Sequence, residues 1–167
     1  MNWRVLTYYI FLIFLLAGCL KPSDTGPSFE EQLKIDLEAI DAYLEINNIP
    51  AIPDPNNLIR YIIHEEGNGD SPETSNCVTT SYEGKFFNGN TFDQSDNLAF
   101  PLDAVILGFQ IGLPLLQVGD SATLYIPSGF GYGPQGAPGI PANSNLIFNL
   151  RLKGMGTEYN GSTGTCL

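Results

Sequence analysis

The sequence has few of the residues on which most catalytic and metal-binding sites depend. It holds one histidine, His64, and three cysteines among its 167 residues, with no Cys-x-x-Cys pair. A Ser-His-Asp site would have to use that histidine, which stands in a predicted strand with no nucleophile or carboxylate placed beside it. Zinc needs a cluster of cysteine and histidine ligands, and the sequence offers none. We therefore expect no metal and no cofactor, and interpret His64 as an ordinary strand residue.

Positive charge is equally scarce. The sequence has 7 Lys and Arg against 18 Asp and Glu, which gives a formal net charge of -11. A protein that binds nucleic acid needs a basic surface against the phosphates, so this balance argues against nucleic acid as a partner. It equally argues against adhesion to anionic lipid head groups through charge. A negative net charge of this size mainly helps to keep a protein soluble.

Residues 1–18 are best interpreted as a bacterial lipoprotein signal peptide. Arg4 supplies a positive charge ahead of an almost unbroken apolar run at residues 5–16. The following Leu16-Ala17-Gly18-Cys19 resembles the lipobox, in which the cysteine is lipid-modified and becomes the new N-terminus. The alternative is a transmembrane anchor, for which the apolar run is short. We expect an envelope protein anchored through a lipid such as palmitate on Cys19 and facing the periplasm. The outer membrane is favoured over the inner, because Leu20 replaces the aspartate of an inner-membrane retention signal.

A tether at residues 19–27 and a helical extension at residues 28–56 follow the signal peptide. Ser28 and Glu31 have the spacing of a capping box, which marks the start of a helix. Asn47 and the residues after it mark its end. Apolar residues then recur at helical spacing on one face: Phe29, Leu33, Leu37, Ile40 and Leu44. This stripe packs either against its own domain or against a second subunit as a homodimer, or it binds another partner.

From residue 58 onward the apolar residues alternate instead of following a helical period. Asn88-Gly89 lies between two aromatic pairs and predicts a hairpin turn. Apolar residues at positions 105–116 suit one short helix laid across a sheet. The fold class we expect is α+β with an antiparallel sheet. The clearest strands are predicted at residues 58–65, 78–82, 121–126 and 146–153.

Short motifs follow one another in a definite order across residues 78–155. The first are Tyr82-Glu83-Gly84, Asn88-Gly89, Phe92-Asp93-Gln94-Ser95, Phe100-Pro101-Leu102 and Val105-Ile106-Leu107-Gly108-Phe109. They are followed by Gly112-Leu113, Gly119-Asp120, Tyr125-Ile126-Pro127, Tyr132-Gly133, Ile140-Pro141 and Leu146-Ile147-Phe148. The order and spacing of these motifs resemble the FKBP family of peptidyl-prolyl cis-trans isomerases. The resemblance implies an FKBP-like antiparallel sheet wrapped around a short α-helix at residues 57–156. The preceding helix resembles the N-terminal extension of bacterial lipoprotein members.

The chemistry that this resemblance implies needs neither a nucleophile nor a metal. When an Xaa–Pro bond twists, the amide loses its resonance and becomes less polar, so an aromatic pocket without water favours the twisted state. By resemblance, the residues that carry the reaction are Tyr82, Asp93, Ile106 (through its backbone N–H) and Tyr132. The residues that bind the substrate's proline are Phe92, Val105, Phe109, Ile140 and Phe148. Phe109 stands where tryptophan is usual, and Leu98 where another rim aromatic is common.

Other functions fit the same residues. A non-catalytic chaperone or peptide-binding envelope lipoprotein would keep the pocket but turn over slowly. An envelope structural lipoprotein would keep only the aromatic residues that its core requires. Retention of nearly the full aromatic set argues against the structural alternative, and activity on a short Xaa–Pro peptide would separate the other two. We expect an isomerase that assists the folding of exported, proline-containing polypeptides.

The remaining cysteines, Cys77 and Cys166, leave two alternatives open. Disulfides persist in exported proteins, so the pair could form one. Residues 157–167 are rich in Gly, Ser and Thr and are expected to be a flexible tail. A disulfide would attach this tail to the sheet, whereas two free thiols would leave it loose.

Overall fold

The computed structural model describes residues 26–167. The expected signal peptide at residues 1–18, the lipidation site at Cys19 and most of the tether at residues 19–27 lie outside the described residues. Within the described part of the chain, no helix combines the length and the apolar character needed to cross a membrane.

Helix α2 (Phe29–Ile46) begins at the capping box that the sequence predicted. The Ser28 Oγ accepts a hydrogen bond from the Glu31 N–H at 3.3 Å, and the Glu31 carboxylate accepts one from the Ser28 N–H at 2.8 Å. These reciprocal bonds satisfy two backbone donors that the first turn leaves without partners. The same bonds lower the pKa of Glu31. The helix ends at Ile46 with Asn47 as its C-cap, where the sequence predicted its end.

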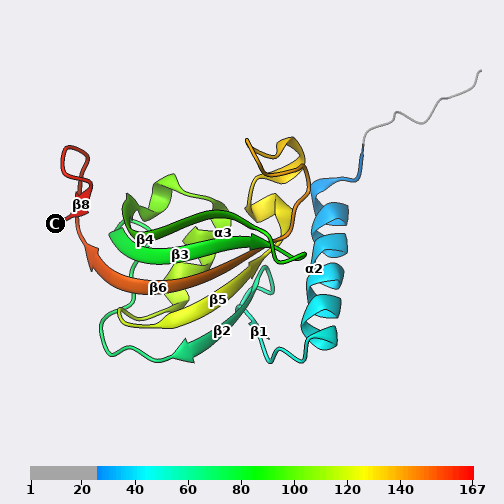
Figure 1. Cartoon of the computed structure of the whole chain (residues 1–167), viewed down its shortest axis with the longest axis horizontal. Helices are drawn as coiled ribbons and strands as arrows, with labels where there is room; N and C mark the ends of the chain where they lie inside the picture. The colour runs from blue at the N-terminus through cyan, green and yellow to red at the C-terminus, as the bar shows by residue number, and fades with distance from the viewer. Residues whose placement is uncertain (1–25) are drawn as a thin grey trace, which may run out of the picture.

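Six strands form one antiparallel sheet in the order β1-β2-β5-β6-β3-β4 (Figure 1), which confirms the expected fold class. In chain order they are β1 (Ile52–Pro53), β2 (Arg60–Glu65), β3 (Cys77–Phe86), β4 (Thr91–Pro101), β5 (Ser121–Ile126) and β6 (Leu146–Gly156). The long strands β3 and β4 meet in the predicted hairpin. Its Gly89 has a φ of 87°, a conformation that glycine adopts without strain.

The inner face of the sheet wraps around the short helix α3 (Leu107–Gly112) (Figure 1). Close contact between them depends on glycine, because a Cβ at Gly112 would lie 2.6 Å from Leu124 Cδ1 on β5. Four short 3-10 helices complete the connections: η1 (Leu102–Ala104), η2 (Leu113–Leu115), η3 (Ser128–Phe130) and η4 (Gly133–Gln135). The fully buried side chains of this main core include Ile59, Val78, Leu102, Leu113, Leu116, Leu124, Ile126, Leu146 and Leu152.

Helix α2 packs on the opposite, outer face at the end of the strands. Its Ile40 and Leu44 form a second buried cluster with Tyr125 of β5 and Ile147 of β6. An ion pair adds to this contact, since Arg60 Nε lies 2.7 Å from the Asp41 carboxylate. The apolar stripe of the helix is therefore used mainly against its own domain, the first of the alternatives that the sequence left open.

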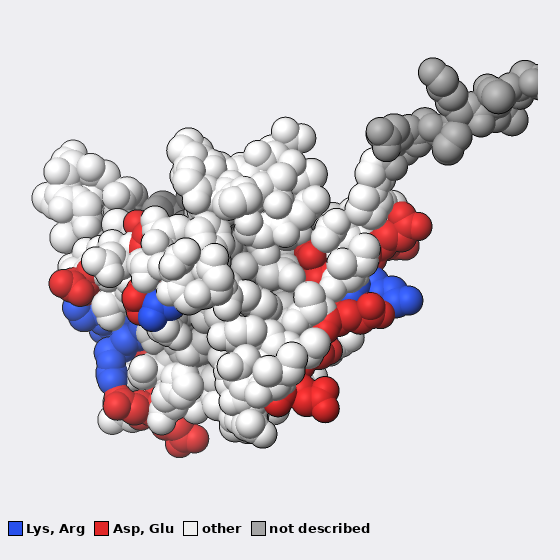
Figure 2. Space-filling view, turned by 45° about the vertical axis from the view of Figure 1, so that its right-hand side comes forward, with Lys and Arg blue, Asp and Glu red and all other residues white. Residues whose placement is uncertain are grey.

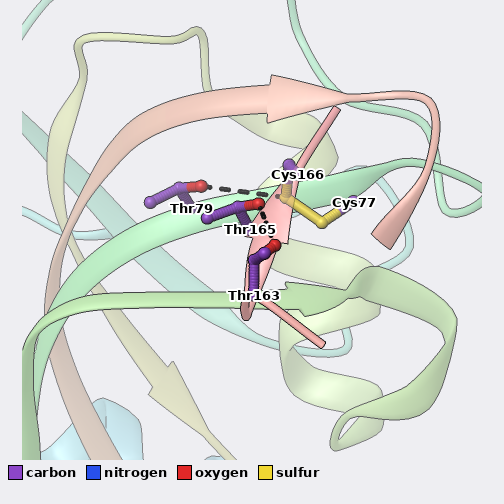
Figure 3. The surroundings of a disulfide bond; sticks show 5 residues. All are labelled: Cys77, Thr79, Thr163, Thr165 and Cys166. Atoms are coloured by element: carbon purple, nitrogen blue, oxygen red, sulfur yellow. Dashed lines mark hydrogen bonds between the residues drawn. A yellow bond between two sulfur atoms is a disulfide. The ribbon is translucent and has the colours of Figure 1, made fainter. Parts of the chain in front are cut away.

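The C-terminal residues form a hairpin, which corrects the prediction of a flexible tail at residues 157–167. Strands β7 (Tyr159–Asn160) and β8 (Thr165–Cys166) pair with each other. Cys166 forms a disulfide with Cys77 of β3, with a Cα–Cα distance of 5.5 Å (Figure 3). The Thr79 hydroxyl donates to Cys166 Sγ at 3.7 Å. Composition alone suggested a loose segment, but the cross-link and the backbone pairing attach it to the end of the sheet.

Candidate active site

A hollow of about 320 Å³ lies on the inner face of the sheet beside α3. Strands β3, β4 and β6 supply one side, and the segment from η1 into α3 supplies the other. Almost every side chain that faces it is apolar or aromatic. The lining residues are Tyr82, Asp93, Leu98, Phe100, Ala104, Val105, Ile106, Phe109, Tyr132 and Phe148.

Phe109 lies at the centre of the aromatic cluster that forms this hollow. Its ring is 4.7 Å from that of Phe148 in an edge-on arrangement and 6.1 Å from that of Phe100 in a stacked one. Tyr82 completes the group with its ring 6.4 Å from Phe109. Such edge-on and offset contacts are the favoured geometries of aromatic rings, so the rings of the cluster stabilise one another as a continuous wall.

Tyr82 and Asp93 supply the polar group of the hollow. They come from the paired strands β3 and β4, and the Tyr82 hydroxyl donates to the Asp93 carboxylate at 2.6 Å. Burial raises the pKa of Tyr82 above its ordinary value, and the hydrogen bond to Asp93 and the charge of that carboxylate raise it further. The hydroxyl therefore remains a protonated donor, and Asp93 is the only formally charged residue among those that line the hollow.

The connection between η1 and α3 holds Val105 and Ile106 against the hollow. Gln110 of α3 fixes this connection, because its side-chain amide donates to the Val105 carbonyl at 2.8 Å. The Ile106 carbonyl accepts from the Phe109 N–H at 2.9 Å and so begins the helix. The N–H of Ile106 itself donates to no backbone acceptor within residues 26–167. It is therefore available for a substrate carbonyl.

Tyr132 closes the mouth of the hollow from a loop between η3 and η4. Its side chain is 37 % exposed, and burial together with the nearby Asp93 charge raises the pKa of its hydroxyl. The surrounding chain is uncharged, since residues 121–150 contain no Asp, Glu, Lys or Arg. Figure 2 shows charged side chains gathered at the two sides of the molecule, with an uncharged upper surface between them.

Two of the nine sequence-predicted pocket residues, Phe92 and Ile140, do not line the hollow. Phe92 lies behind Phe148, with ring centres 5.6 Å apart, and its ring fills the space where a Cβ on Gly84 would stand. Ile140 is 8 % exposed and packs into the main core. Phe92 thus supports the wall from behind and Ile140 belongs to the core. The spacing of aromatic and apolar residues along a strand or loop cannot distinguish such residues from those that line the hollow.

Three lining residues were not among the predicted pocket residues. Leu98 and Phe100 share the inner face of β4, and alternation along that strand was the signal that could have identified them. Leu98 is 41 % exposed at the mouth, in agreement with its expected rim position. Ala104 ends η1, and nothing in its local sequence marks it.

A second and larger hollow, of about 700 Å³, lies on the outer face of the sheet. Its side chains are mainly polar and bind one another. The ring of His64 hydrogen-bonds Thr123 Oγ1 through Nε2 at 2.8 Å, and Thr123 in turn donates to the Asn149 side chain at 2.8 Å. Arg151 pairs with Glu65. Because these polar groups are already paired, and His64 and Asn149 among them are exposed, this hollow is a poorer site for an apolar ring than the inner one.

An antiparallel sheet wrapped around a short helix, with an aromatic hollow between them, defines an FKBP-type domain. The profile of the FKBP-type peptidyl-prolyl cis-trans isomerase family matches residues 69–153, half of the chain. The chain belongs to this family.

Individual relatives agree with this assignment. Peptidyl-prolyl cis-trans isomerase Mip of Coxiella burnetii is 38 % identical over 117 residues, which cover 66 % of this chain and 51 % of Mip. The chain thus spans about half the length of that relative. FK506-binding protein 1 of Saccharomyces cerevisiae is 42 % identical over 88 residues, which cover 48 % of this chain and 77 % of the yeast protein. A crystal structure of a peptidyl-prolyl cis-trans isomerase from Pseudomonas syringae aligns with a TM-score of 0.64 and 28 % identity, covering 73 % of this chain and 94 % of that one.

Proposed function

We propose that the protein catalyses cis-trans isomerisation of Xaa–Pro bonds in exported polypeptides. The observation that carries this proposal is the inner hollow, which is lined by aromatic and aliphatic side chains and has one charged residue, Asp93, at its edge. Rotation about an Xaa–Pro bond takes tens to hundreds of seconds without a catalyst, because the partial double bond must be broken. A site that removes water from the amide stabilises the less polar, twisted state more than either planar state.

The side chains around the hollow suit distinct roles in this reaction. Phe109, Phe148 and Val105 hold the proline ring, and the Ile106 N–H donates to the carbonyl that precedes or follows it. The Tyr132 hydroxyl is a second donor at the mouth. The hydrogen bond from Tyr82 to Asp93 keeps the one carboxylate turned to the edge, where water reaches it. Each role uses desolvation or a hydrogen bond, and none requires a proton transfer.

Phe109 in place of the usual tryptophan widens the floor of the hollow. Phenylalanine is smaller than tryptophan and has no indole N–H, so the floor offers the substrate only apolar contact. We infer that the site accepts bulky residues before proline and binds large ring-shaped inhibitors more weakly than a site with tryptophan.

The test of isomerase activity is a protease-coupled or NMR exchange assay with the purified full chain and a short Xaa–Pro peptide. We expect acceleration of cis-trans exchange that saturates with peptide, while the matched Xaa–Ala peptide neither binds nor competes. A folded protein that binds the Xaa–Pro peptide without accelerating exchange would instead support the alternative, a non-catalytic chaperone or peptide-binding module. A protein that neither binds nor accelerates would refute both.

We further propose that the protein is a lipid-anchored member of the cell envelope, with the domain facing the periplasm. The support is the lipobox-like sequence ending at Cys19 and the short polar tether that follows it. Metabolic labelling with palmitate should modify the wild-type chain and leave Cys19→Ser unlabelled. Separation of inner from outer membranes should place the labelled protein in the outer fraction, and recovery of unlabelled wild type in the aqueous phase would contradict the anchor.

A homodimer through α2 stays a prediction. The apolar stripe that suggested it packs in large part against Tyr125 and Ile147, although Ile35 and Ile46 of the helix are exposed. Sedimentation equilibrium of the full chain, compared with Ile35→Ser, would decide between a monomer and a dimer.

A further inference from the structure

Asp36 is a buried acidic residue that the proposed reaction does not use. It lies on α2, outside the isomerase hollow, and is only 2 % exposed. A carboxylate is rarely buried unless other groups satisfy it, because removing it from water is costly. The groups that satisfy Asp36 therefore indicate what it does.

The Asp36 carboxylate binds the loop that follows β5. Its Oδ2 accepts from the Ser128 N–H at 2.8 Å and from the Ser128 hydroxyl at 2.6 Å. Its Oδ1 accepts from the Gln32 side chain, one turn earlier on α2, at 2.7 Å. Asn145, which precedes β6, contacts both partners: its Oδ1 accepts from the Ser128 N–H at 3.0 Å, and its Nδ2 donates to the Asp36 carbonyl at 3.5 Å.

A second contact joins the same helix to the same loop. Phe29, in the first turn of α2, packs edge-on against Phe130 with ring centres 5.7 Å apart. It also lies against Gly129, where an added Cβ would come within 2.7 Å of the Phe29 ring. Helix α2 thus holds all three residues of η3, one through a charge-assisted pair of hydrogen bonds and two through aromatic packing.

The loop held in this way carries a residue of the isomerase hollow. Ser128 opens η3, and Tyr132 follows four residues later at the mouth. Between them, Phe130 is buried in the main core, and the Gly131 N–H donates to the Ser128 carbonyl at 3.0 Å. A displacement of Ser128 would therefore be passed through this bond to Gly131 and its neighbour Tyr132.

We propose that Asp36 is a positioning residue for the isomerase site, which fixes Ser128 and through it sets Tyr132 at the mouth of the hollow. The proposal rests on the proposed function, because it assigns a purpose to the helical extension within that reaction. The extension is then part of the working site and does more than connect the domain to its tether. When only a fraction of molecules holds the loop in the binding position, apparent affinity falls by that same fraction.

The test compares four variants of the full chain. Asp36→Ala removes both hydrogen bonds that the carboxylate accepts from Ser128, whereas Ser128→Ala removes only the bond from the hydroxyl and leaves the one from the backbone N–H. Asp36→Asn is the conservative variant, since its carbonyl oxygen can still accept from Ser128 while the Gln32 amide turns to accept from its NH₂ group. Leu44→Ala is the matched control, because it weakens the packing of α2 on Tyr125 and Ile147 without touching the loop.

The expected result is a change in KM that thermal stability does not explain. Asp36→Ala should raise KM for an Xaa–Pro peptide about five-fold while kcat changes less than about two-fold. Ser128→Ala should raise KM less than Asp36→Ala does, and Asp36→Asn should keep KM near the wild-type value. Leu44→Ala should lower Tm at least as much as Asp36→Ala yet leave KM unchanged. Amide exchange of Gly131 should accelerate in Asp36→Ala but not in Leu44→Ala.

Two results would overturn the proposal. One is an unchanged KM and unchanged Gly131 exchange in Asp36→Ala and Ser128→Ala. The other is a KM that rises in proportion to the loss of Tm in all variants, Leu44→Ala included, which would make Asp36 a merely structural residue. Should Asp36→Ala fail to fold, Ser128→Ala and Asp36→Asn still decide the question. An inactive wild type would refute the proposed function, whereas the exchange of Gly131 would still test whether Asp36 fixes the loop.

Discussion

The two faces of the sheet each carry a hollow, and the larger hollow is the less suited to isomerisation. The outer one measures about 700 Å³ and the inner one about 320 Å³. The outer hollow is lined mainly by polar side chains, among them Thr123 and Asn149, which bind each other, and Arg151, which pairs with Glu65. The inner hollow is lined by Phe109, Phe148 and their neighbours. On the proposed mechanism, capacity to exclude water, and not volume, decides where an amide can be twisted.

Side chains alternate between the two faces of the sheet along each strand, and this alternation produces the contrast between the polar outer hollow and the apolar inner one. On β6, Phe148 points to the inner hollow, whereas Asn149 belongs to the outer one. The outer face is itself divided, because Ile147 and Tyr125 are covered by α2 while the polar positions beyond them stay open. Neighbouring residues on one strand therefore provide matched substitutions with which the comparison of the two faces can be tested.

The largest difference between the faces is expected for Phe148→Ala against Asn149→Ala. Phe148 is 4 % exposed and contacts three aromatic rings, so its loss should lower the free energy of unfolding by about 3–5 kcal/mol. The opened hollow should also lose activity about 100-fold. Asn149→Ala should cost less than about 1 kcal/mol and leave activity unchanged. Urea unfolding and the coupled assay measure both, and equal effects would contradict the division.

The disulfide should contribute to stability without contributing to activity. It closes a segment with a sequence separation of 89 and lies at the start of β3, away from Tyr82. Cys166→Ser, or reduction by dithiothreitol, should lower the free energy of unfolding by about 2–4 kcal/mol. Activity per folded molecule should remain at the wild-type level. A parallel loss of activity would mean that the C-terminal hairpin supports the inner hollow.

Tyr82→Phe should have a smaller effect, seen mainly in activity. The substitution keeps the ring and removes the hydroxyl that binds Asp93. A hydrogen bond to a charged group contributes about 1.5–3 kcal/mol, and solvent at the exposed Asp93 favours the lower end, so we expect about a ten-fold loss of kcat/KM. Ser81→Ala, its neighbour on the outer face, is the control and should change nothing. Loss in both variants would point to a general disturbance of β3.

The smallest expected effect is a loss of folding stability at alkaline pH, when Tyr82 loses its proton. Burial first, and Asp93 second, raises the pKa of Tyr82 above its ordinary value of 10.0. Between pH 10.0 and the higher pKa of the folded state, Tyr82 keeps a proton in the folded protein that it has lost in the unfolded chain. The stability that this proton contributes is therefore fully present below pH 10.0 and falls as pH rises through the folded pKa. Absorbance titration of tyrosinate should show a late-titrating group that is missing in Tyr82→Phe.

Much of the fold could be predicted because it depends on local patterns. The capping box at Ser28 and Glu31, the Asn88-Gly89 turn and the alternation in β6 each specify an element through contacts close in sequence. The FKBP-like order of motifs then placed Tyr82, Asp93, Val105, Ile106, Phe109, Tyr132 and Phe148 near one another, and all seven line the inner hollow.

What could not be predicted depends on contacts distant in sequence. Asp36 is acidic yet buried, and it lies three residues after Leu33 and four before Ile40, within the apolar stripe. Its partner Ser128 is 92 residues away. The sequence left the Cys77–Cys166 disulfide open, because its two ends are separated by 89 residues and local pattern could not decide between an attached and a loose C-terminal tail. Pairing across such distances is decided by packing, which the local pattern does not encode.

The central claim is that the inner hollow works because it is apolar. Val105→Thr tests this most directly, since it keeps the shape of the side chain and adds one hydroxyl to the wall. Thr123→Val is the reverse change in the outer hollow. In the Xaa–Pro exchange assay, the account predicts about a ten-fold loss of kcat for Val105→Thr with Tm nearly unchanged, and wild-type activity for Thr123→Val. Full activity in Val105→Thr, or a comparable loss in Thr123→Val, would contradict it.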